Sequence, residues 1–215
     1  MGHRPAMKLI IFGASRGVGR ALTEQALAHG HQITAVARER EALTLTHPAL
    51  CNLPGDVTDA GFVSVATPGH DVVFCTLGAD KRGPTTLYST AARNIVTSMA
   101  AHGLRRLIFL SNFGVLSETA QDVSGTALLL LARVMLRDTL ADHRRALYEM
   151  RRWDLDWTAV RPMRLTDGPF TGRYRIALDG IPRGGTNISR ADVADFMLRQ
   201  ASSDEYVRQV PAIAY

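Results

Sequence analysis

Apolar residues along this chain follow two alternating patterns. Short continuous apolar runs are typical of buried strands, and the segments between them carry apolar residues at the three- to four-residue spacing of helices. The expected strands are residues 8–12, 32–37, 50–53, 72–77 and 106–110, and the expected helices are residues 18–29, 59–65 and 87–102. This alternation predicts an α/β fold, a doubly wound parallel sheet with helices on both faces.

The alternation changes after residue 111. A loop leads into a long helical stretch at residues 126–152, and further strands are expected at residues 157–161 and 172–178. Ser189 is a good N-cap for a closing helix through Gln200, because Asp192 occupies the third helical position. No repeat or linker divides the chain, so we expect residues 1–215 to form a single domain with a small C-terminal substrate rim over the carboxyl ends of the strands.

Composition supports a globular domain with a sizeable core. The 215 residues are 46% apolar and 21% charged, which excludes a disordered chain, a fibrous repeat and a disulfide-stapled miniprotein. The net charge of +5, from 25 Lys and Arg against 20 Asp and Glu, suits an anionic partner. The arginines are scattered and lack interleaved aromatic residues, so nucleic acid is not the expected partner.

Three features bear on where the protein works. Cys51 and Cys75 lie in strand-like stretches without a CxxC pairing, so we expect both to be buried, reduced thiols. Residues 1–6 lack the apolar region of a signal peptide. The longest apolar run, residues 126–136, contains Arg133 and is much shorter than the roughly 20 residues of a membrane span, so it predicts a buried or partner-facing helix. Together they predict a cytoplasmic protein with no membrane partner.

The most informative motif is a glycine-rich turn between the first strand and the first helix. Its glycines would let the chain turn tightly, bring backbone N–H groups close to a pyrophosphate and pack the helix on the strand. Because it follows an apolar strand and opens a helix, it predicts a Rossmann-type dinucleotide site; an ordinary tight turn is the alternative. The expected cofactor contacts are Gly13, Ser15, Arg16, Gly17, Val18 and Gly19.

The end of the second strand indicates which dinucleotide is bound. About twenty residues beyond the turn, where an acidic side chain would bind the ribose of NAD, the chain carries Arg38. An arginine there can stack on adenine and pair with a 2′-phosphate, so that with Ser15 and Arg16 it favours NADPH over NADH. The alternative is that Arg38 is a solvated cation beside Glu39.

Two further strand ends add weaker signals for the same cofactor. Asp56 and Val57 resemble the adenine-binding Asp-Val pair of short-chain dehydrogenases, a family that the glycine spacing also resembles. Thr76, Leu77 and Gly78 end the next strand, where glycine lets the backbone lie against the cofactor. Their order at successive strand ends predicts one binding edge of the sheet.

The fifth strand delivers Ser111, Asn112 and Phe113 to that edge, and we expect all three to contact the cofactor. In short-chain dehydrogenases a serine here faces the nicotinamide, and a Tyr and a Lys four residues apart on the next helix relay a proton. Counting back from the following strand gives Thr139 and His143, so that pair is missing. His143 either bonds a ribose hydroxyl in place of the lysine or is a capping or surface histidine in the polar cluster at residues 142–145.

Short motifs spread along the chain are shared with one known group. They are ARNIV at 92–96, AHG at 101–103, DH at 142–143, PFTGRY at 169–174, LDG at 178–180, ISRADV at 188–193, FML at 196–198 and DEY at 204–206. They resemble the biliverdin reductase B/flavin reductase group of atypical, NAD(P)H-binding (NmrA-like) short-chain dehydrogenases. The resemblance implies an NADPH-dependent reductase that works as a monomer or weak dimer without bound metal. After the sixth strand, Pro162 and Met163 are expected cofactor contacts, and Arg164 replaces the group's substrate-side histidine.

These features predict an NADPH-dependent reductase that transfers hydride to a conjugated acceptor such as a flavin, a quinone or a bilin. Such acceptors spread the incoming charge over a ring system and can take their proton from water, so they need placement more than acid catalysis. Ser111 is expected to position the ring or the carboxamide, and Arg164 to offer charge to the acceptor. Two alternatives stay open: an NmrA-like NADP-sensing regulator without turnover, and a tailoring reductase or epimerase acting on an aromatic secondary metabolite.

Overall fold

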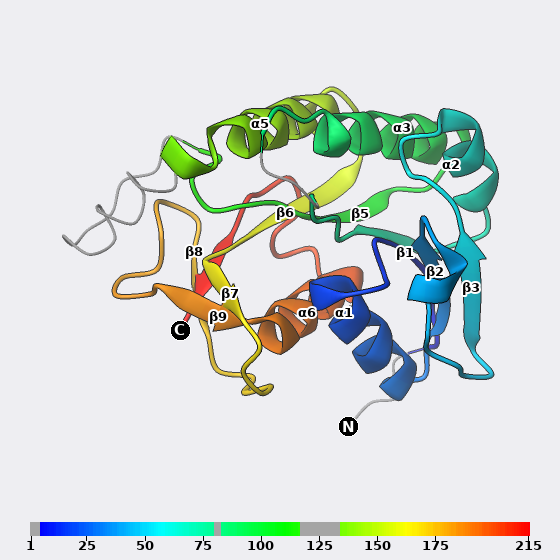
Figure 1. Ribbon diagram of the computed structural model, residues 1–215, viewed down its shortest axis with the longest axis horizontal. Coiled ribbons are helices and arrows are strands. Elements are labelled where there is room, and N and C mark those ends of the chain that lie inside the picture. The colour runs from blue at the N-terminus through cyan, green and yellow to red at the C-terminus, as the bar shows by residue number, and fades with distance from the viewer. Residues whose placement is uncertain (1–4, 80–82, 117–133) are drawn as a thin grey trace.

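The computed structural model describes residues 5–79, 83–116 and 134–215, and strands alternate with helices as predicted (Figure 1). The strands are β1 (Lys8–Phe12), β2 (Gln32–Ala37), β3 (Leu50–Pro54), β4 (Val72–Cys75), β5 (Arg106–Leu110), β6 (Asp156–Pro162), β7 (Arg164–Thr166), β8 (Arg175–Ala177), β9 (Asn187–Ser189) and β10 (Ala212–Ala214). The helices are α1 (Gly17–Ala28), α2 (Ala60–Ala66), α3 (Leu87–Ala101), α5 (Arg137–Arg151) and α6 (Arg190–Arg199), with 3₁₀ turns η1 (Arg40–Ala42) and η2 (Gln200–Ser202).

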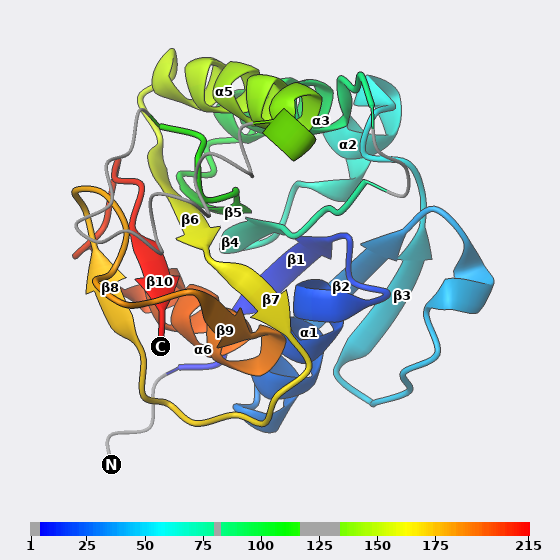
Figure 2. The ribbon, with the colours of Figure 1, turned by 60° about the vertical axis from the view of Figure 1, so that its left-hand side comes forward.

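The main sheet has the strand order β3-β2-β1-β4-β5-β6-β10-β8 (Figure 2). Neighbouring strands from β3 to β10 are parallel, and β8 pairs with β10 in the antiparallel sense at one edge. The strand order reverses between β1 and β4, where open α/β sheets bind ligands beyond the carboxyl ends of the strands. The structure therefore has the predicted Rossmann-type doubly wound fold.

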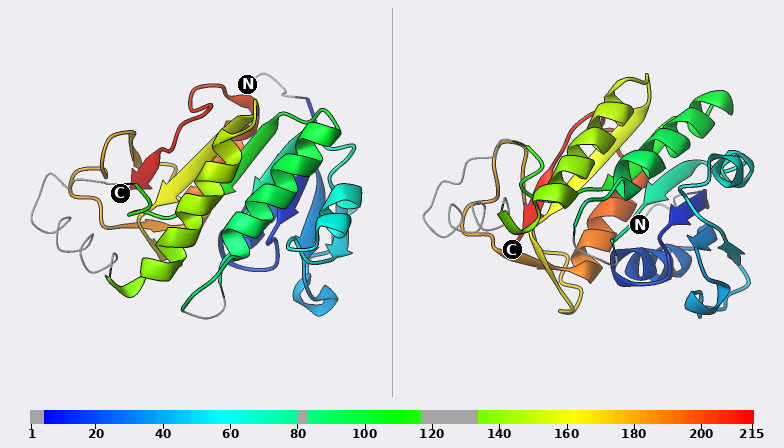
Figure 3. Two further views of the ribbon diagram at one scale, coloured as in Figure 1. Left: turned by 90° about the horizontal axis from the view of Figure 1, so that it is seen from above. Right: turned by 45° about the horizontal axis from the view of Figure 1, so that its top comes forward.

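Helices cover both faces of the sheet, with α2, α3 and α5 on one face and α1 and α6 on the other (Figures 1 and 3). The central strand β1 shows why its sequence requires this arrangement. Ile10 and Phe12 join the core cluster under α3 and α5, whereas Leu9 and Ile11 join the cluster under α1 and α6. Because successive side chains of a strand face opposite sides, a continuous apolar run produces a strand that is buried on both faces.

The closing helix α6 begins as predicted, with Ser189 Oγ accepting a hydrogen bond of 3.0 Å from the backbone N–H of Asp192. The Asp192 carboxylate is buried and accepts bonds from the N–H groups of Thr171 at 2.9 Å and Gly172 at 2.8 Å, and from the Tyr215 hydroxyl at 2.6 Å. Burial alone raises the pKa of Asp192, but these hydrogen bonds outweigh it and hold the pKa below its usual range. Asp192 thus fastens the loop before β8 to α6.

The predicted strand at residues 172–178 is too long. Gly172 has a φ of +64° and its N–H is bonded to Asp192, so the extended conformation begins only at Arg175. The sequence does not predict β7, β9 and β10, because the apolar pattern of a three-residue strand is too short to recognise. These short strands build the C-terminal rim beside β6 (Figure 2).

Arg161 on β6 ties this rim to the sheet. It is fully buried, and its Nε donates to the Val210 carbonyl at 2.7 Å while Nη2 donates to the Leu178 carbonyl at 3.2 Å. Burial lowers its pKa to about 10, which leaves the guanidinium charged at neutral pH. The side chain therefore links β6 to the segment before β10 and to the loop after β8.

The predicted helix at residues 126–152 is described only in its second part, because residues 126–133 lie outside the described part of the chain. Within that part α5 begins at Arg137, and Leu136 breaks the helix with a φ of −113°. Val134 and Met135 are 79% and 49% exposed, so of the two expectations, a buried or a partner-facing helix, the first is wrong at these two positions. None of the described helices is long and apolar enough to cross a membrane.

The two cysteines differ in environment. Cys75 on β4 is buried as predicted, and burial raises the pKa of its thiol to about 12, so it stays protonated. The prediction was wrong for Cys51, which is exposed on β3 because β3 is the edge strand of the sheet. Both thiols are free.

Candidate functional site

The turn after β1 depends on glycine at two positions. Gly13 has a φ of +87°, and its N–H and that of Ala14 donate to the Val36 carbonyl at 2.9 and 3.1 Å. Gly17 opens α1 with a φ of +59°. Because side chains rarely adopt these backbone conformations, glycine lets the chain leave β1, cross the end of β2 and enter the helix within a tight loop.

Gly19 lets α1 pack closely on the ends of β1 and β4. A Cβ at Gly19 would lie 2.1 Å from the Gly13 carbonyl oxygen and 2.5 Å from Thr76 Oγ1. Thr76 follows β4, and its hydroxyl is placed to donate to the carbonyl of Phe12 at 3.0 Å and of Gly13 at 3.2 Å. Thr76 therefore joins β1 and β4 at the point where the strand order reverses.

We expect Gly19→Ala to lower the free energy of unfolding by about 1 to 2 kcal/mol, because the added Cβ forces backbone atoms apart in a packed region. Urea unfolding followed by circular dichroism measures the change. Gly78→Ala is the matched control, since a Cβ there meets no atom of the described residues within 4 Å. Equal destabilisation of the two variants would contradict the packing role of Gly19.

The first turn of α1 can hold an anion. Its N-cap residue, Arg16, makes no side-chain capping bond, and the first turn contains no acidic residue. The first N–H groups of a helix have no partner within the helix and carry a partial positive charge, so they suit a phosphate. Arg16 adds a formal positive charge beside them.

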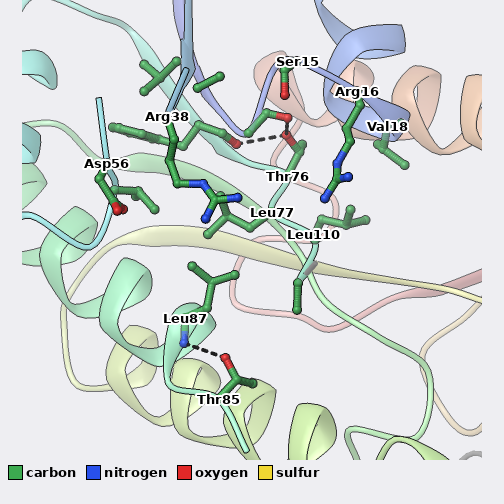
Figure 4. Close-up of a pocket in the computed structure, with 18 of the residues that line it drawn as sticks. Ser15, Arg16, Val18, Arg38, Asp56, Thr76, Leu77, Thr85, Leu87 and Leu110 are labelled. Carbon is green, nitrogen blue, oxygen red and sulfur yellow. Dashed lines mark hydrogen bonds between the residues drawn. The ribbon is translucent and has the colours of Figure 1, made fainter. Parts of the chain in front are cut away.

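These groups belong to a pocket of about 930 Å³ beyond the carboxyl ends of β1, β2 and β4 (Figure 4). Ligand sites span about 300–1,000 Å³, so this pocket can take a large ligand. The sequence-predicted residues in its wall are Gly13, Ser15, Arg16, Gly17, Val18, Arg38, Asp56, Val57, Thr76, Leu77 and Gly78. Gly19 lies behind this wall, where it packs against Gly13.

The charged side chains of the pocket come from neighbouring loops. Arg38 and Arg16 both extend toward the middle of the pocket in Figure 4. Asp56 Oδ1 accepts 2.8 Å bonds from both the N–H and the hydroxyl of Thr58, which fixes the orientation of the carboxylate. Two guanidinium groups, an open helix N-terminus and one carboxylate suit an adenosine that carries phosphates.

The rest of the pocket wall is largely apolar. Leu87 and Leu110 lie away from the glycine turn in Figure 4, and Leu77 and Leu165 also line the pocket. Among the described lining residues there is no tyrosine and no lysine. This side of the pocket can hold a flat, apolar ring but offers few groups that transfer protons.

Ser111 and Asn112 follow Leu110 at the end of β5. The Ser111 N–H donates to the Val160 carbonyl at 2.7 Å, which fixes the backbone. Ser111 Oγ and Asn112 Oδ1 are buried and have no hydrogen-bond partner among the described residues. An unpaired buried polar atom is costly, so these two atoms suit hydrogen bonds with a ligand. Neither residue forms part of the described pocket wall itself.

His143 on α5 is buried, with 3% of its surface exposed. Its ring stacks on Tyr88 with 3.8 Å between centroids and lies edge-on to Phe109 at 6.4 Å. Burial lowers the pKa of His143 to about 4 against the opposing charge of Asp142, so the ring is neutral at pH 7. Nδ1 has no hydrogen-bond partner among the residues described. The alternative that His143 belongs to a polar surface cluster is therefore wrong.

Asp142 holds this arrangement in place. Its carboxylate is fully buried and accepts bonds from the Tyr88 N–H at 2.8 Å and from Ser89 Oγ at 2.5 Å, and Arg145 lies 3.2 Å away. The carboxylate thus caps the N-terminus of α3 from the neighbouring helix α5. This contact sets Tyr88 against His143.

Three further expected cofactor contacts, Phe113, Pro162 and Met163, and the expected acceptor-side residue Arg164 do not line this pocket in the described part of the chain. Pro162 ends β6, and Met163 is 1% exposed and packs with Phe113 and Ile181. Arg164 opens β7 and is exposed. Pro162, Met163, Arg164 and Phe113 are absent from the described pocket wall, so the structure does not bring them together with the turn.

The pocket also contains residues that sequence reasoning missed. Arg190 opens α6, Asp167 follows β7, and Pro84 and Thr85 precede α3, yet all four line the same pocket as the turn. No motif marks Pro84, Thr85 and Asp167, and the ISRADV segment that contains Arg190 indicates no cofactor contact. The position of all four depends on how distant segments fold back over the sheet. One signal was present, since the Ser189 cap places Arg190 at a helix N-terminus.

A comparison with protein families identifies the pocket's ligand class. Residues 13–204 match the family described as NAD(P)H-binding. The chain belongs to this family. The match begins at the first glycine of the turn and includes the described lining of the pocket except Phe12. The open N-terminus of α1 and the guanidinium groups of Arg16 and Arg38 fit the phosphates of an NAD(P)H cofactor.

Curated relatives of this NAD(P)H-binding chain match it only in part. An uncharacterised protein of Mycobacterium tuberculosis H37Rv is 32% identical over 108 residues, which are 49% of this chain and 12% of the relative. An uncharacterised oxidoreductase of Schizosaccharomyces pombe is 38% identical over 58 residues, 27% of this chain and 20% of the relative. The matches therefore span a small part of these relatives.

Solved structures share the fold over nearly the full length. A short-chain dehydrogenase/reductase from Veillonella parvula, in complex with NADP, has a TM-score of 0.80 at 20% identity and covers 98% of this chain and 95% of its own. A Rossmann-fold NAD(P)-binding protein from Shigella flexneri has a TM-score of 0.75 at 22% identity and covers 97% and 93%. At these identities the likeness establishes the fold of the NAD(P)H-binding chain and no more.

Proposed function

We propose that this protein is an NADPH-dependent reductase whose acceptor is a conjugated ring system such as a flavin, a quinone or a bilin. The observation that carries the proposal is the neutral, buried His143 at the place where short-chain dehydrogenases hold a charged lysine. A neutral imidazole cannot lower the pKa of a catalytic tyrosine, and no tyrosine lines the described pocket. An acceptor that needs no proton from the enzyme suits such a site.

In this proposal each polar group of the site has its own role in binding the cofactor or the acceptor. The N-terminus of α1 and Arg16 hold the diphosphate, and Arg38 holds the 2′-phosphate. Ser111 Oγ bonds the carboxamide or the acceptor ring, and His143 Nδ1 bonds a ribose hydroxyl, which satisfies two buried atoms that otherwise lack partners within the described chain. The reduced nicotinamide supplies the hydride when it is bound. Arg164 offers positive charge at the rim.

Other parts of the proposal rest on the motifs and on composition. The resemblance to the biliverdin reductase B/flavin reductase group supports a broad acceptor range and a monomer or weak dimer. The free thiols of Cys51 and Cys75 support a cytoplasmic location. Arg164, in place of that group's histidine, suits an anionic acceptor.

We expect the purified protein to oxidise NADPH in the presence of FMN, a quinone or biliverdin, and Ser111→Ala to reduce the rate about tenfold. One lost hydrogen bond to the reacting complex is worth about 1.4 kcal/mol, which is a factor of ten in rate. Absorbance at the NADPH band gives initial rates for each acceptor. Ser64→Ala, on the exposed surface of α2, is the matched control and should behave as wild type.

The rates also separate this function from a regulatory one. A protein that binds NADP⁺ but oxidises NADPH no faster than buffer with every acceptor is not a reductase. That result would favour an NADP-sensing regulator, a role that the exposed Val134 and Met135 before α5 fit, because apolar side chains in solvent suit contact with another protein.

A further inference from the structure

Arg190 and Asp167 form an ion pair at the mouth of the cofactor pocket. Arg190 is the first residue of α6, and Asp167 follows β7, so both belong to the C-terminal rim. Arg190 Nη1 donates to Asp167 Oδ1 at 2.5 Å. Both residues line the same pocket as the glycine turn.

The Arg190 side chain lies over that turn. If Gly17 had a Cβ, the Cδ and Nε atoms of Arg190 would each be 3.7 Å from it, which is ordinary van der Waals contact. Gly17 opens α1, whose first N–H groups are the expected anion site. The guanidinium of Arg190 therefore lies close to the expected anion site.

The ion pair between Arg190 and Asp167 is weak. The Asp167 side chain is 91% exposed and that of Arg190 is 32% exposed. Ion pairs in such exposed positions contribute little to stability, because water and salt screen them. A phosphate at the turn carries negative charge and several acceptor oxygens, and the planar fork of an arginine matches it well. Arg190 can therefore exchange a carboxylate for a phosphate at small cost.

We propose that Arg190 binds the diphosphate of the cofactor and that Asp167 is its partner when no dinucleotide is bound. The proposal rests on the NAD(P)H site and adds a residue from the rim to it. Because Arg190 contacts a group common to both dinucleotides, it does not discriminate NADPH from NADH.

The test compares Arg190→Met and Asp167→Asn in calorimetric titrations with NADP⁺ and with NAD⁺. We expect Arg190→Met to raise both dissociation constants about tenfold, or about 1.4 kcal/mol, and to leave their ratio unchanged. Asp167→Asn removes the competing carboxylate and should lower both constants about threefold. Arg173→Met, an exposed arginine in the loop between the two residues, is the matched control and should bind as wild type.

Opposite effects of the two variants cannot come from a fold defect, since one weakens binding and the other strengthens it. Unchanged dissociation constants in Arg190→Met would overturn the proposal, as would a loss confined to NADP⁺, which would assign Arg190 to the 2′-phosphate. If the wild-type protein binds both dinucleotides but has no reductase activity, the proposed function is wrong. The role of Arg190 in dinucleotide binding is still tested by the titrations.

Discussion

Arg38→Asp is expected to reverse the cofactor preference of this protein. Arg38 follows β2 and points into the pocket beside Asp56, where the adenosine ribose of a dinucleotide would lie (Figure 4). A hydrogen bond between charged groups is worth about 1.5 to 3 kcal/mol, and a carboxylate would also repel a 2′-phosphate. We therefore expect the affinity for NADPH to fall about 100-fold, while NADH binds unchanged or better because the new carboxylate can accept bonds from its 2′-hydroxyl.

Titrations of both reduced cofactors by fluorescence measure the two affinities. Arg40→Asp is the matched control, because it changes the net charge by the same amount two residues away. Arg40 is also exposed, and it lies on η1, outside the described pocket wall. If Arg38→Asp kept the NADPH preference of wild type, the assignment of the 2′-phosphate to Arg38 would be wrong. Equal losses in both variants would indicate only a general effect of net charge.

The phosphate end of the pocket could be predicted from the sequence because its chemistry is local. Gly13, Gly17 and Arg38 each lie at or just beyond a strand end, and the parallel order of the strands brings those ends to one edge. The same reasoning could not find Asp167 and Arg190. Their contact with the turn depends on the path of the C-terminal rim, whose three-residue strands carry no clear pattern.

The burial of His143 depends equally on tertiary packing. The sequence places it in a polar run, Asp142 to Arg145, which is typical of a surface helix. In the structure Asp142 turns inward to cap α3, at Tyr88 and Ser89 more than fifty positions earlier in the chain. The helical spacing of Leu140, His143 and Leu147 puts His143 on the buried face of α5, but its polar neighbours obscure this pattern. The exposure of Cys51 is likewise not visible in its apolar surroundings in the sequence, since it follows from the edge position of β3.

His143 should make the stability of the apoprotein depend on pH. Its pKa is about 4 in the folded state, against about 6.5 in an unfolded chain. Below pH 6.5 the unfolded state takes up a proton that the folded state does not, so the contribution to stability is complete above pH 6.5 and is lost as the pH falls toward 4. At about 1.4 kcal/mol per pH unit, lowering the pH from 7.5 to 4.5 should cost about 2 to 3 kcal/mol.

Urea unfolding of wild type and His143→Phe at both pH values measures this loss, because phenylalanine keeps a ring against Tyr88 and does not titrate. The variant should lose less stability than wild type by that amount, since the other titrating groups are shared and cancel in the difference. His102→Phe replaces an exposed histidine at the end of α3 and should keep the wild-type dependence. If the curve of His143→Phe instead runs parallel to that of wild type, folding does not lower the pKa of His143. The lowered pKa from which the reductase proposal argues would then be wrong.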